Sequence, residues 1–506
     1  MIPLLHPLFL LSLFLLALLF LFIRTRSSGK NNLKLPPSPT RLPIIGNLYQ
    51  LGTHPHRSLK SLSEKFGPLM LLSFGQVPTL VVSSADIVND IIKNHDVVFS
   101  SRPKTTAGDI LLYGGKNVSF APYGEYWRQV RKICVVELLS LRRVQEFGYV
   151  RDEEVVVLVD KLHEACLDES CVNLSAMLMA TFNNIICRCV LGQSYSEEND
   201  GGSKYGELSR RMMVDMMAFC FGDFFPSLKW IDVLIGFTAR VRSTAQALDA
   251  FSDQVVEEHK TKKSYSGGST NLEDFVDILL RVQKEGTLDF ELTGENIKAI
   301  LQDMLVGGTD TTTTTIEWLM AELIRNPRVM KKTQDEVRRV VGKKPEIDMN
   351  DINQMAYLKC VIKESMRLHP TAPFLLPRET TSSIEMKGYN IPAKTRVLIN
   401  VFAIHRDSNS WERPEEFFPE RFENNPIDFK GQDSHLIPFG FGRRGCPGLM
   451  FGMINLEYII ANILYWFDWK LSNNEASPED LDMSEIYGVV LHKKVPLHLI
   501  PVSYLP

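Results

Sequence analysis

The chain has 506 residues, of which 44% are hydrophobic and 23% charged, as in globular proteins and unlike disordered, collagen-like or low-complexity ones. Its 56 Lys and Arg residues nearly balance 60 Asp and Glu residues, and the net charge of −4 argues against a nucleic-acid partner. A mean hydropathy of −0.05 excludes a polytopic membrane protein.

The N-terminus carries the one candidate membrane span. Residues 1–23 contain no Lys, Arg, Asp or Glu, and this apolar run is long enough to cross a bilayer core of about 30 Å. A cleaved signal peptide is the main alternative, but no basic residue precedes the run and no small-x-small cleavage site closes it. We expect a retained transmembrane anchor. The basic residues after it predict that the rest of the chain faces the cytosol; they are Arg24, Arg26, Lys30 and Lys34.

Residues 24–43 are basic and then rich in proline, which favours an extended segment and excludes a helix. We expect this stretch to be a hinge between the anchor and the body. No second linker of similar strength follows, so 44–506 is predicted to form one large domain. On the cytosolic side, the sequons at Asn117 and Asn173 would stay unglycosylated.

The spacing of apolar residues predicts a mainly α-helical body with a small β region. One long helix is expected to start at a cap on Thr293 and to stop before Pro327, and shorter helices are expected over 357–369 and 449–466. Short strands are expected at 69–73, 79–82 and 396–401. The eight cysteines lack paired CxxC spacing, which predicts reduced thiols rather than a disulfide framework.

The run 439–448, FGFGRRGCPG, surrounds Cys446 with four glycines and a proline. This composition predicts a loop, because neither a helix nor a central strand favours it. A cysteine just before a helix N-terminus, with loop N–H groups directed at it, is in surroundings that stabilise a thiolate. Taken alone, the pattern fits a buried, inert cysteine better.

The pattern F-x-x-G-x-R-x-C-x-G within this run resembles the haem-binding loop of the cytochrome P-450 family. It is filled by Phe439, Gly442, Arg444, Cys446 and Gly448. Five fixed positions arise by chance in a chain of this length on the order of once in ten thousand sequences. The resemblance implies that Cys446 is the thiolate ligand of the iron of haem b, that Phe439 packs near the haem and that Arg444 pairs with a propionate.

Two smaller matches imply further contacts with the haem propionates. Trp127 and Arg131 fill a WxxxR pattern that resembles the family's propionate-binding helix, and Arg378 lies in a Pro-Arg-Glu segment. Each of these, taken singly, is as well explained by ordinary surface charge. Together they supply the cationic groups that two carboxylates require.

Glu364 and Arg367 share one helix face at i, i+3 spacing, where an exposed ion pair is the simplest interpretation. The segment 419–422, PERF, resembles a second family motif, and this resemblance implies that Arg421 joins Glu364 and Arg367 in a buried triad. Burying three charges costs several kcal/mol unless all are paired. We therefore expect a structural role on which haem incorporation depends.

The long helix is interrupted by poor helix formers at Gly307 and Gly308 and by threonines over 309–315. A Thr-rich loop between two shorter helices is the alternative; in a helix, the hydroxyls can bond back to carbonyls and open the ladder. The segment resembles the family's oxygen-binding motif, which implies that the glycines let the helix pass close over the haem. It also implies that Thr311 holds a hydrogen-bonded water and that Asp310 relays protons. Relatives usually carry Ala where Gly307 stands, so we expect a wider pocket or a less tightly held kink in the long helix.

The resemblance covers nearly the whole body, and the segment 122–127, PYGEYW, looks like plant microsomal members of the seventy-one clan. It implies a monooxygenase of the endoplasmic reticulum membrane that uses O2 and electrons passed from NADPH by a flavoprotein reductase. The possible basic face for this partner comprises Lys132, Arg142, Arg143 and Arg443.

The segments that shape the substrate pocket in relatives are apolar in this chain, so a hydrophobic plant metabolite is expected, a terpenoid first and a phenolic or an alkaloid next. The candidate pocket residues are Ile110, Met304, Ala372, Phe374, Leu375 and Val489. A haem-thiolate isomerase or dehydratase without an electron donor is one alternative, against which the Asp310–Thr311 pair argues. A non-catalytic haem-binding protein is the other.

Overall fold

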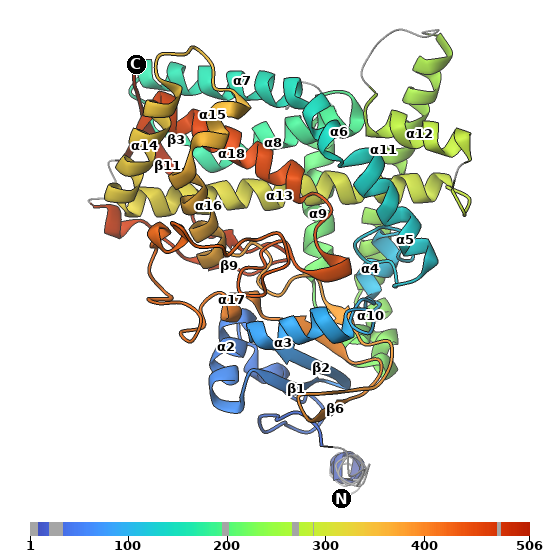
Figure 1. The fold of residues 1–506 in the computed structure, drawn as a ribbon. Helices are drawn as coiled ribbons and strands as arrows, with labels where there is room; N and C mark the ends of the chain where they lie inside the picture. Colours follow the sequence, from blue (N-terminus) through green and yellow to red (C-terminus); the bar gives the residue numbers. More distant parts are fainter. Residues whose placement is uncertain are drawn as a thin grey trace, which may run out of the picture.

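The structure is a computed structural model that describes residues 9–19, 34–194, 202–265, 273–286, 288–472 and 477–505. Helices make up most of the molecule, and the small sheet of β1 and β2 lies beside them at the end nearest the N-terminus (Figure 1). The prediction of a mainly α-helical single domain with a small β region is confirmed.

The helices in the first part of the body are α2 (Pro55–Phe66), α3 (Ala85–Asp90), α4 (Thr106–Leu111), α5 (Glu125–Lys132), α6 (Leu141–Glu146), α7 (Gly148–Leu167) and α8 (Leu174–Leu191). Those that follow are α9 (Gly202–Met217), α10 (Lys229–Leu234), α11 (Phe237–Tyr265), α12 (Phe275–Glu285), α13 (Gly294–Arg325), α14 (Pro327–Val341), α15 (Met349–Gln354), α16 (Ala356–Leu368), α17 (Val401–Ile404) and α18 (Leu449–Trp466). The predicted helices at 357–369 and 449–466 correspond to α16 and α18.

The largest sheet has the order β1-β2-β7-β4, in which only β2 and β7 are parallel. Its strands are β1 (Leu69–Phe74), β2 (Val77–Val82), β4 (Arg378–Glu379) and β7 (Arg396–Ile399). A second sheet, of order β3-β11-β8, joins β3 (Val172–Asn173), β8 (Phe467–Leu471) and β11 (His498–Ser503). Two hairpins pair β5 (Ile384–Met386) with β6 (Tyr389–Ile391), and β9 (Glu485–Ile486) with β10 (His492–Lys493).

The three predicted strands are present as β1, β2 and β7, but the last ends at Ile399 rather than at 401. The reason is local, because Asn400 caps the short helix α17, and its side-chain oxygen accepts the N–H of Ala403 at 3.2 Å. A capped helix start removes Val401 from the sheet.

Helix α13 crosses the centre of the molecule, where it packs against α8 and α16 (Figure 1). Thr293 caps it in a capping box with Asn296, and the helix ends at Arg325, as the cap and Pro327 predict. The Gly and Thr stretch is helical throughout, so the alternative of a loop between two helices is wrong. Four threonine hydroxyls bond to carbonyls four residues earlier without interrupting the helix: Thr309, Thr311, Thr313 and Thr315.

The described part of the predicted anchor is the helix Phe9–Leu19, whose apolar side chains are mostly exposed. The rest of 1–23, and the basic residues up to 33, lie outside the described residues. Two other helices, α8 and α18, are long and apolar enough to span a membrane, but both are largely buried in the body. They are core helices, and only the N-terminal run remains a candidate among the described helices.

The proline-rich segment rests on the body. Pro36 and Pro39 are buried, and the carbonyl of Pro37 accepts the N–H of Leu71 in β1 at 3.0 Å. The carbonyl of Lys34 accepts the N–H of Asn390 in β6 at 2.7 Å. The described part of the predicted hinge, from residue 34 onward, is therefore fixed to two strands.

Candidate active site

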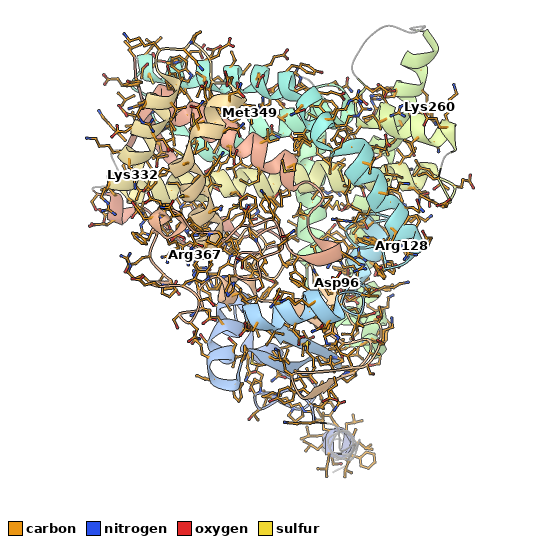
Figure 2. All side chains as sticks on the ribbon, in the orientation of Figure 1. Asp96, Arg128, Lys260, Lys332, Met349 and Arg367 are labelled. Carbon is orange, nitrogen blue, oxygen red and sulfur yellow. The ribbon has the colours of Figure 1, made fainter. Side chains whose placement is uncertain are left out.

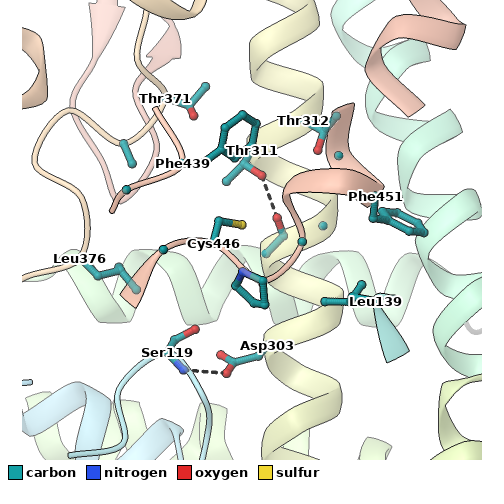
Figure 3. Close-up of a pocket in the computed structure, with 18 of the residues that line it drawn as sticks. Ser119, Leu139, Asp303, Thr311, Thr312, Thr371, Leu376, Phe439, Cys446 and Phe451 are labelled. Atoms are coloured by element: carbon teal, nitrogen blue, oxygen red, sulfur yellow. Dashed lines mark hydrogen bonds between the residues drawn. The ribbon is translucent and has the colours of Figure 1, made fainter. Parts of the chain in front are cut away.

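One cavity lies between α13, the segment that follows α16 and the loop that carries Cys446 (Figure 3). Eleven of the candidate site residues predicted from the sequence line it: Arg131, Met304, Gly307, Gly308, Thr311, Ala372, Leu375, Arg378, Phe439, Arg444 and Cys446. Most other lining residues are apolar, such as Leu139, Ile186 and Phe451. The cysteine loop and the Gly-Thr segment of α13, about 135 residues apart in sequence, thus open into the same space.

The cysteine loop is held by backbone geometry that only glycine adopts freely. Gly440 and Gly442 have φ angles of 72° and 60°. A Cβ on Gly442 would lie 2.4 Å from Oδ1 of Asp96, so a larger residue there would also collide with a side chain. The N–H of Cys446 donates to the carbonyl of Phe439 at 2.8 Å, and α18 starts at Leu449. Cys446 therefore lies just ahead of a helix N-terminus, as predicted.

The electrostatic expectation for Cys446 needs a correction. Burial within the body raises the pKa of its thiol, while a hydrogen bond from the Gly448 N–H and the charge of Arg131 act in the opposite direction without reversing the shift. The exposed surface of the Cys446 side chain faces the cavity. The effect of desolvation on the thiol pKa is thus larger than that of the helix N-terminus. A cation bound to the sulfur would stabilise the thiolate.

Four arginines line one part of the cavity: Arg102, Arg131, Arg378 and Arg444. Burial, followed by repulsion from Arg378 and Arg131, lowers the pKa of Arg444 to about 9. Burial lowers the pKa of Arg378 to about 10, and its Nε and Nη1 are buried with no hydrogen-bond partner in the described part of the chain. Unpaired buried cations call for anions. The cluster therefore fits a ligand that carries carboxylates, such as the two propionates of haem b.

The remaining donors of this cluster organise the segment before α5. Nε of Arg444 donates to the carbonyl of Ser100 at 2.6 Å, and its Nη1 donates to that of Val118 at 3.2 Å. The indole N–H of Trp127 donates to the same Val118 carbonyl at 3.0 Å, and its ring lies 4.3 Å from the Arg444 guanidinium. Trp127 itself does not line the cavity. Trp127 packs against the Arg444 guanidinium, and its contact with a propionate stays a prediction.

The two glycines of α13 have different surroundings. A Cβ on Gly308 would lie 2.4 Å from Cδ1 of Ile186, so the close approach there is to α8. A Cβ on Gly307 would meet no atom within 4 Å, because the cavity opens beside it. Gly307 therefore leaves open space at the cavity, whereas Gly308 allows the close approach of α13 to α8.

Thr311 and Asp310 point to different sides of α13. The Thr311 hydroxyl lines the cavity and donates to the carbonyl of Gly307 at 2.7 Å (Figure 3). Asp310 is not among the lining residues, and its Oδ2 lies 3.4 Å from Nε2 of His492 in β10. The predicted pair is thus divided between the cavity and the C-terminal hairpin.

The structure brings the three predicted triad residues together. Arg367 donates to both carboxylate oxygens of Glu364 at 2.8 Å, and Nε of Arg421 donates to Oε1 at 3.1 Å. Glu364 and Arg367 are fully buried, and Arg367 also donates to the carbonyls of His405 and Pro414. Arg367 lies inside the body, whereas Lys332 lies at its edge (Figure 2). The exposed i, i+3 pair considered above is excluded.

Three predicted pocket residues lie outside the cavity lining: Ile110, Phe374 and Val489. Phe374 is buried in a separate cluster with residues of β1 and β2. The next residue, Leu375, has a φ of 54° and faces the cavity. This backbone turn separates the two neighbours, and a hydrophobic run does not reveal it.

Several cavity residues carry no motif in the sequence. Asp303 accepts the side-chain amide of Asn117 at 2.8 Å. It also accepts the N–H of Ser119 at 3.0 Å (Figure 3). Nε2 of His369 lies 2.7 Å from Oε1 of Glu322. The only feature of the sequence that could have placed Asp303 in the cavity is its position one turn before Gly307 on the same face of α13.

Three of the four residues in the predicted basic face are paired within the chain. Arg142 and Arg143 share Glu146, and Arg443 lies 2.8 Å from Asp96. Lys132 is exposed. The net positive charge available to an acidic partner is therefore smaller than the sequence implies.

Comparison with known proteins agrees with this site. The profile of the family described as cytochrome P-450 matches residues 36–500. A phenylacetaldehyde oxime monooxygenase of Prunus mume is 55% identical over 98% of this chain and 95% of its own length. A strychnine-11-hydroxylase of Strychnos nux-vomica is 45% identical over 95% of this chain and 94% of its own length. A zebra fish cytochrome P-450 with progesterone has a TM-score of 0.76 at 26% identity, covering 88% of this chain and 99% of that one. The chain belongs to the cytochrome P-450 family, resembles its plant seventy-one clan and is a monooxygenase.

Proposed function

We propose that this enzyme uses O2 and electrons delivered from NADPH by a flavoprotein reductase to oxidise a hydrophobic plant specialised metabolite. The observation that carries the proposal is the meeting of Cys446, the arginine cluster and Thr311 in one apolar cavity. Cys446 would ligate the iron of haem b, and Arg378 with its neighbours would hold the two propionates. A haem bound there supplies the activation of dioxygen.

The chain's own groups control water and protons in this cavity. The apolar lining excludes bulk water, which limits side reactions. The Thr311 hydroxyl donates its proton to the Gly307 carbonyl, so its oxygen lone pairs remain able to accept a hydrogen bond from a water molecule. Replacing Thr311 with Ala removes this acceptor and should raise the hydrogen peroxide released per NADPH.

The apolar cavity suits each of the three classes predicted from the sequence, a terpenoid, a phenolic or an alkaloid. The two plant relatives are named for phenylacetaldehyde oxime and strychnine. We therefore propose that a nitrogen-bearing aromatic metabolite be placed ahead of a terpenoid. Asp303 and Ser119 provide polar groups in an otherwise apolar lining, where one oriented polar contact can fix a substrate.

We further propose a single-pass anchor in the endoplasmic reticulum membrane, with the catalytic domain in the cytosol. The exposed apolar helix Phe9–Leu19 supports the anchor. Asn117 is fully buried and its amide donates to Asp303, so the folded chain cannot carry a glycan there. Unchanged gel mobility after endoglycosidase treatment is expected, and a shift would contradict this orientation.

The test is product formation in microsomes that contain the full chain, with phenylacetaldehyde oxime, a monoterpene and an alkaloid as separate probes. NADPH-dependent product that requires a co-expressed reductase supports a monooxygenase driven by that partner. Product without reductase and NADPH would indicate an isomerase or a dehydratase. Haem binding without turnover of any probe would exclude these three compounds as substrates.

A further inference from the structure

His492 is the ionisable partner of Asp310. It lies in β10 of the C-terminal hairpin, and its Nε2 is 3.4 Å from Oδ2 of Asp310. Its Nδ1 is 3.0 Å from the hydroxyl oxygen of Thr314. Asp310 and Thr314 are four residues apart on α13 and so share one face of the helix. A single imidazole therefore bridges two successive turns of α13.

This contact lies on the side of α13 that leads toward solvent. The side chain of His492 is 35% exposed and that of Asp310 is 21% exposed, while Asp310 does not line the cavity. Thr311, the next residue, does line the cavity. Asp310 thus has an ionisable partner on its solvent side from which it can receive a proton.

The hairpin holds His492 in a fixed position. The carbonyl of Leu491 accepts the indole N–H of Trp318 in α13 at 2.9 Å, and the Leu491 N–H donates to the carbonyl of Thr371 at 2.9 Å. Thr371 lines the cavity. The strand β10 also pairs with β9. The residue before His492 is thus bonded both to α13 and to the cavity wall, which makes the imidazole part of a rigid arrangement.

We propose that His492 is the positioning residue of Asp310 and the donor from which that carboxylate regains its proton. The inference rests on the proposed monooxygenase function. In the proposed step, the Nε2–H bond of the His492 imidazolium breaks as an O–H bond forms on Oδ2 of the Asp310 carboxylate, and the resulting neutral imidazole takes a proton from hydronium or a buffer acid in the solvent. No electrons move. Insertion of one oxygen atom from O2 consumes two protons and two electrons and forms one water, so two such transfers serve one turnover.

The surrounding charges favour the protonated imidazole. Burial lowers the pKa of His492, but the hydrogen bond and charge of Asp310, with the charge of Glu317, outweigh burial and raise it above the usual value. Lys493 follows in the same strand. Glu485, across the hairpin, is engaged with His56 and Arg57. Because the pKa is raised, the cationic donor is present at lower pH and is lost as the pH rises through that value.

The first test measures the pairing without turnover. Exchange of the imidazole C2 proton with deuterium, followed by mass spectrometry of the haem-loaded full chain, gives the titration midpoint of each histidine. The midpoint of His492 should lie above 6.5, the ordinary value, and should fall in Asp310→Asn. His498, an exposed histidine in β11, is the internal control and should not change. An unchanged His492 midpoint in Asp310→Asn would overturn the pairing.

The second test measures proton supply without an organic substrate. With reductase and NADPH, O2 leaves either as hydrogen peroxide, at one NADPH per O2, or as water, at two. Glutamine can still bond to Asp310 but cannot deliver a proton. His492→Gln should therefore at least double the peroxide per NADPH at neutral pH and remove the rise of this ratio with pH. His498→Gln is the matched control and should behave as the unmodified chain.

A fully haem-loaded His492→Gln protein with the unmodified peroxide ratio and pH profile would refute the donor role. If this variant does not take up haem, the inference is tested by the first experiment alone, which compares the titration midpoint of His492 in the unmodified chain and in Asp310→Asn. Failure of the proposed function is separate, because it would show as absent reductase-dependent NADPH consumption in the unmodified chain itself.

Discussion

The carboxylate of Asp303 on α13 accepts the backbone N–H of Ser119 at 3.0 Å in the cavity wall. It also accepts the side-chain amide of Asn117, so it ties the segment before α5 to the central helix. The same segment supplies the Val118 carbonyl to Arg444 and Trp127. One carboxylate thereby connects the cavity wall to the arginine cluster.

Replacing Asp303 with Ala should lower the free energy of unfolding by about 1 to 3 kcal/mol, because two donors are left without a partner. It should also speed haem loss, since the Val118 carbonyl loses its fixed position. Urea unfolding and transfer of haem to an excess of an apo-globin acceptor measure the two effects. Asp289→Ala, which removes an exposed carboxylate that accepts Gln129, is the control. Equal behaviour of both variants would contradict the tether.

The contrast between the two glycines of α13 predicts opposite results for one added methyl group. Gly308→Ala should destabilise the protein by about 1 to 3 kcal/mol, because the new Cβ collides with Ile186. Gly307→Ala should keep its stability and narrow the cavity. The double variant Gly308→Ala with Ile186→Ala should recover part of the lost stability. Thermal unfolding checks all three, and a Gly308→Ala protein as stable as the unmodified chain would refute this packing account.

Arg378 lines the cavity, and two of its buried nitrogens have no hydrogen-bond partner among the residues that the structure describes. Arg378→Leu should therefore accelerate haem loss by at least tenfold, since a carboxylate would lose its buried cation. Arg396 is a half-buried arginine in β7 that does not line the cavity, and Arg396→Leu controls for destabilisation of the sheet. The prediction fails if both variants release haem at the same rate.

Glu364 and Arg367 form a fully buried ion pair, and removing one partner leaves an uncompensated charge. Glu364→Ala or Arg367→Ala should cost about 3 to 5 kcal/mol and abolish haem incorporation. Absorbance of haem relative to protein after purification is the measurement. A soluble Glu364→Ala protein with a full complement of haem would contradict this role.

The long elements of the fold were predictable because their signals are local. Thr293 and Pro327 mark the ends of α13, and β-branched residues mark β1 and β2. The cysteine loop was equally predictable, because its backbone has positive φ angles that require glycine at two positions. In contrast, Arg102, Asp303 and His492 reach the site through contacts between residues far apart in sequence, which no spacing reveals. The turn at Leu375 that separates it from Phe374 is a backbone feature of the same kind.

The charge on Cys446 shows a second limit. Its place before α18 was readable, but the direction of its pKa shift depends on how deeply the body buries it, and burial is a property of the assembled core. The charge of the predicted basic face is smaller than expected for a related reason, because Glu146 and Asp96 approach its arginines only in the folded chain.

Ligation of haem iron by the sulfur of Cys446 is the claim on which the proposed function depends. The direct measurement is the difference spectrum of the reduced protein with carbon monoxide, compared between the unmodified chain and Cys446→Ser. The unmodified chain should show the red-shifted Soret band of thiolate ligation, and Cys446→Ser should lose it. A colourless unmodified protein, or the same band retained in Cys446→Ser, would contradict the assignment.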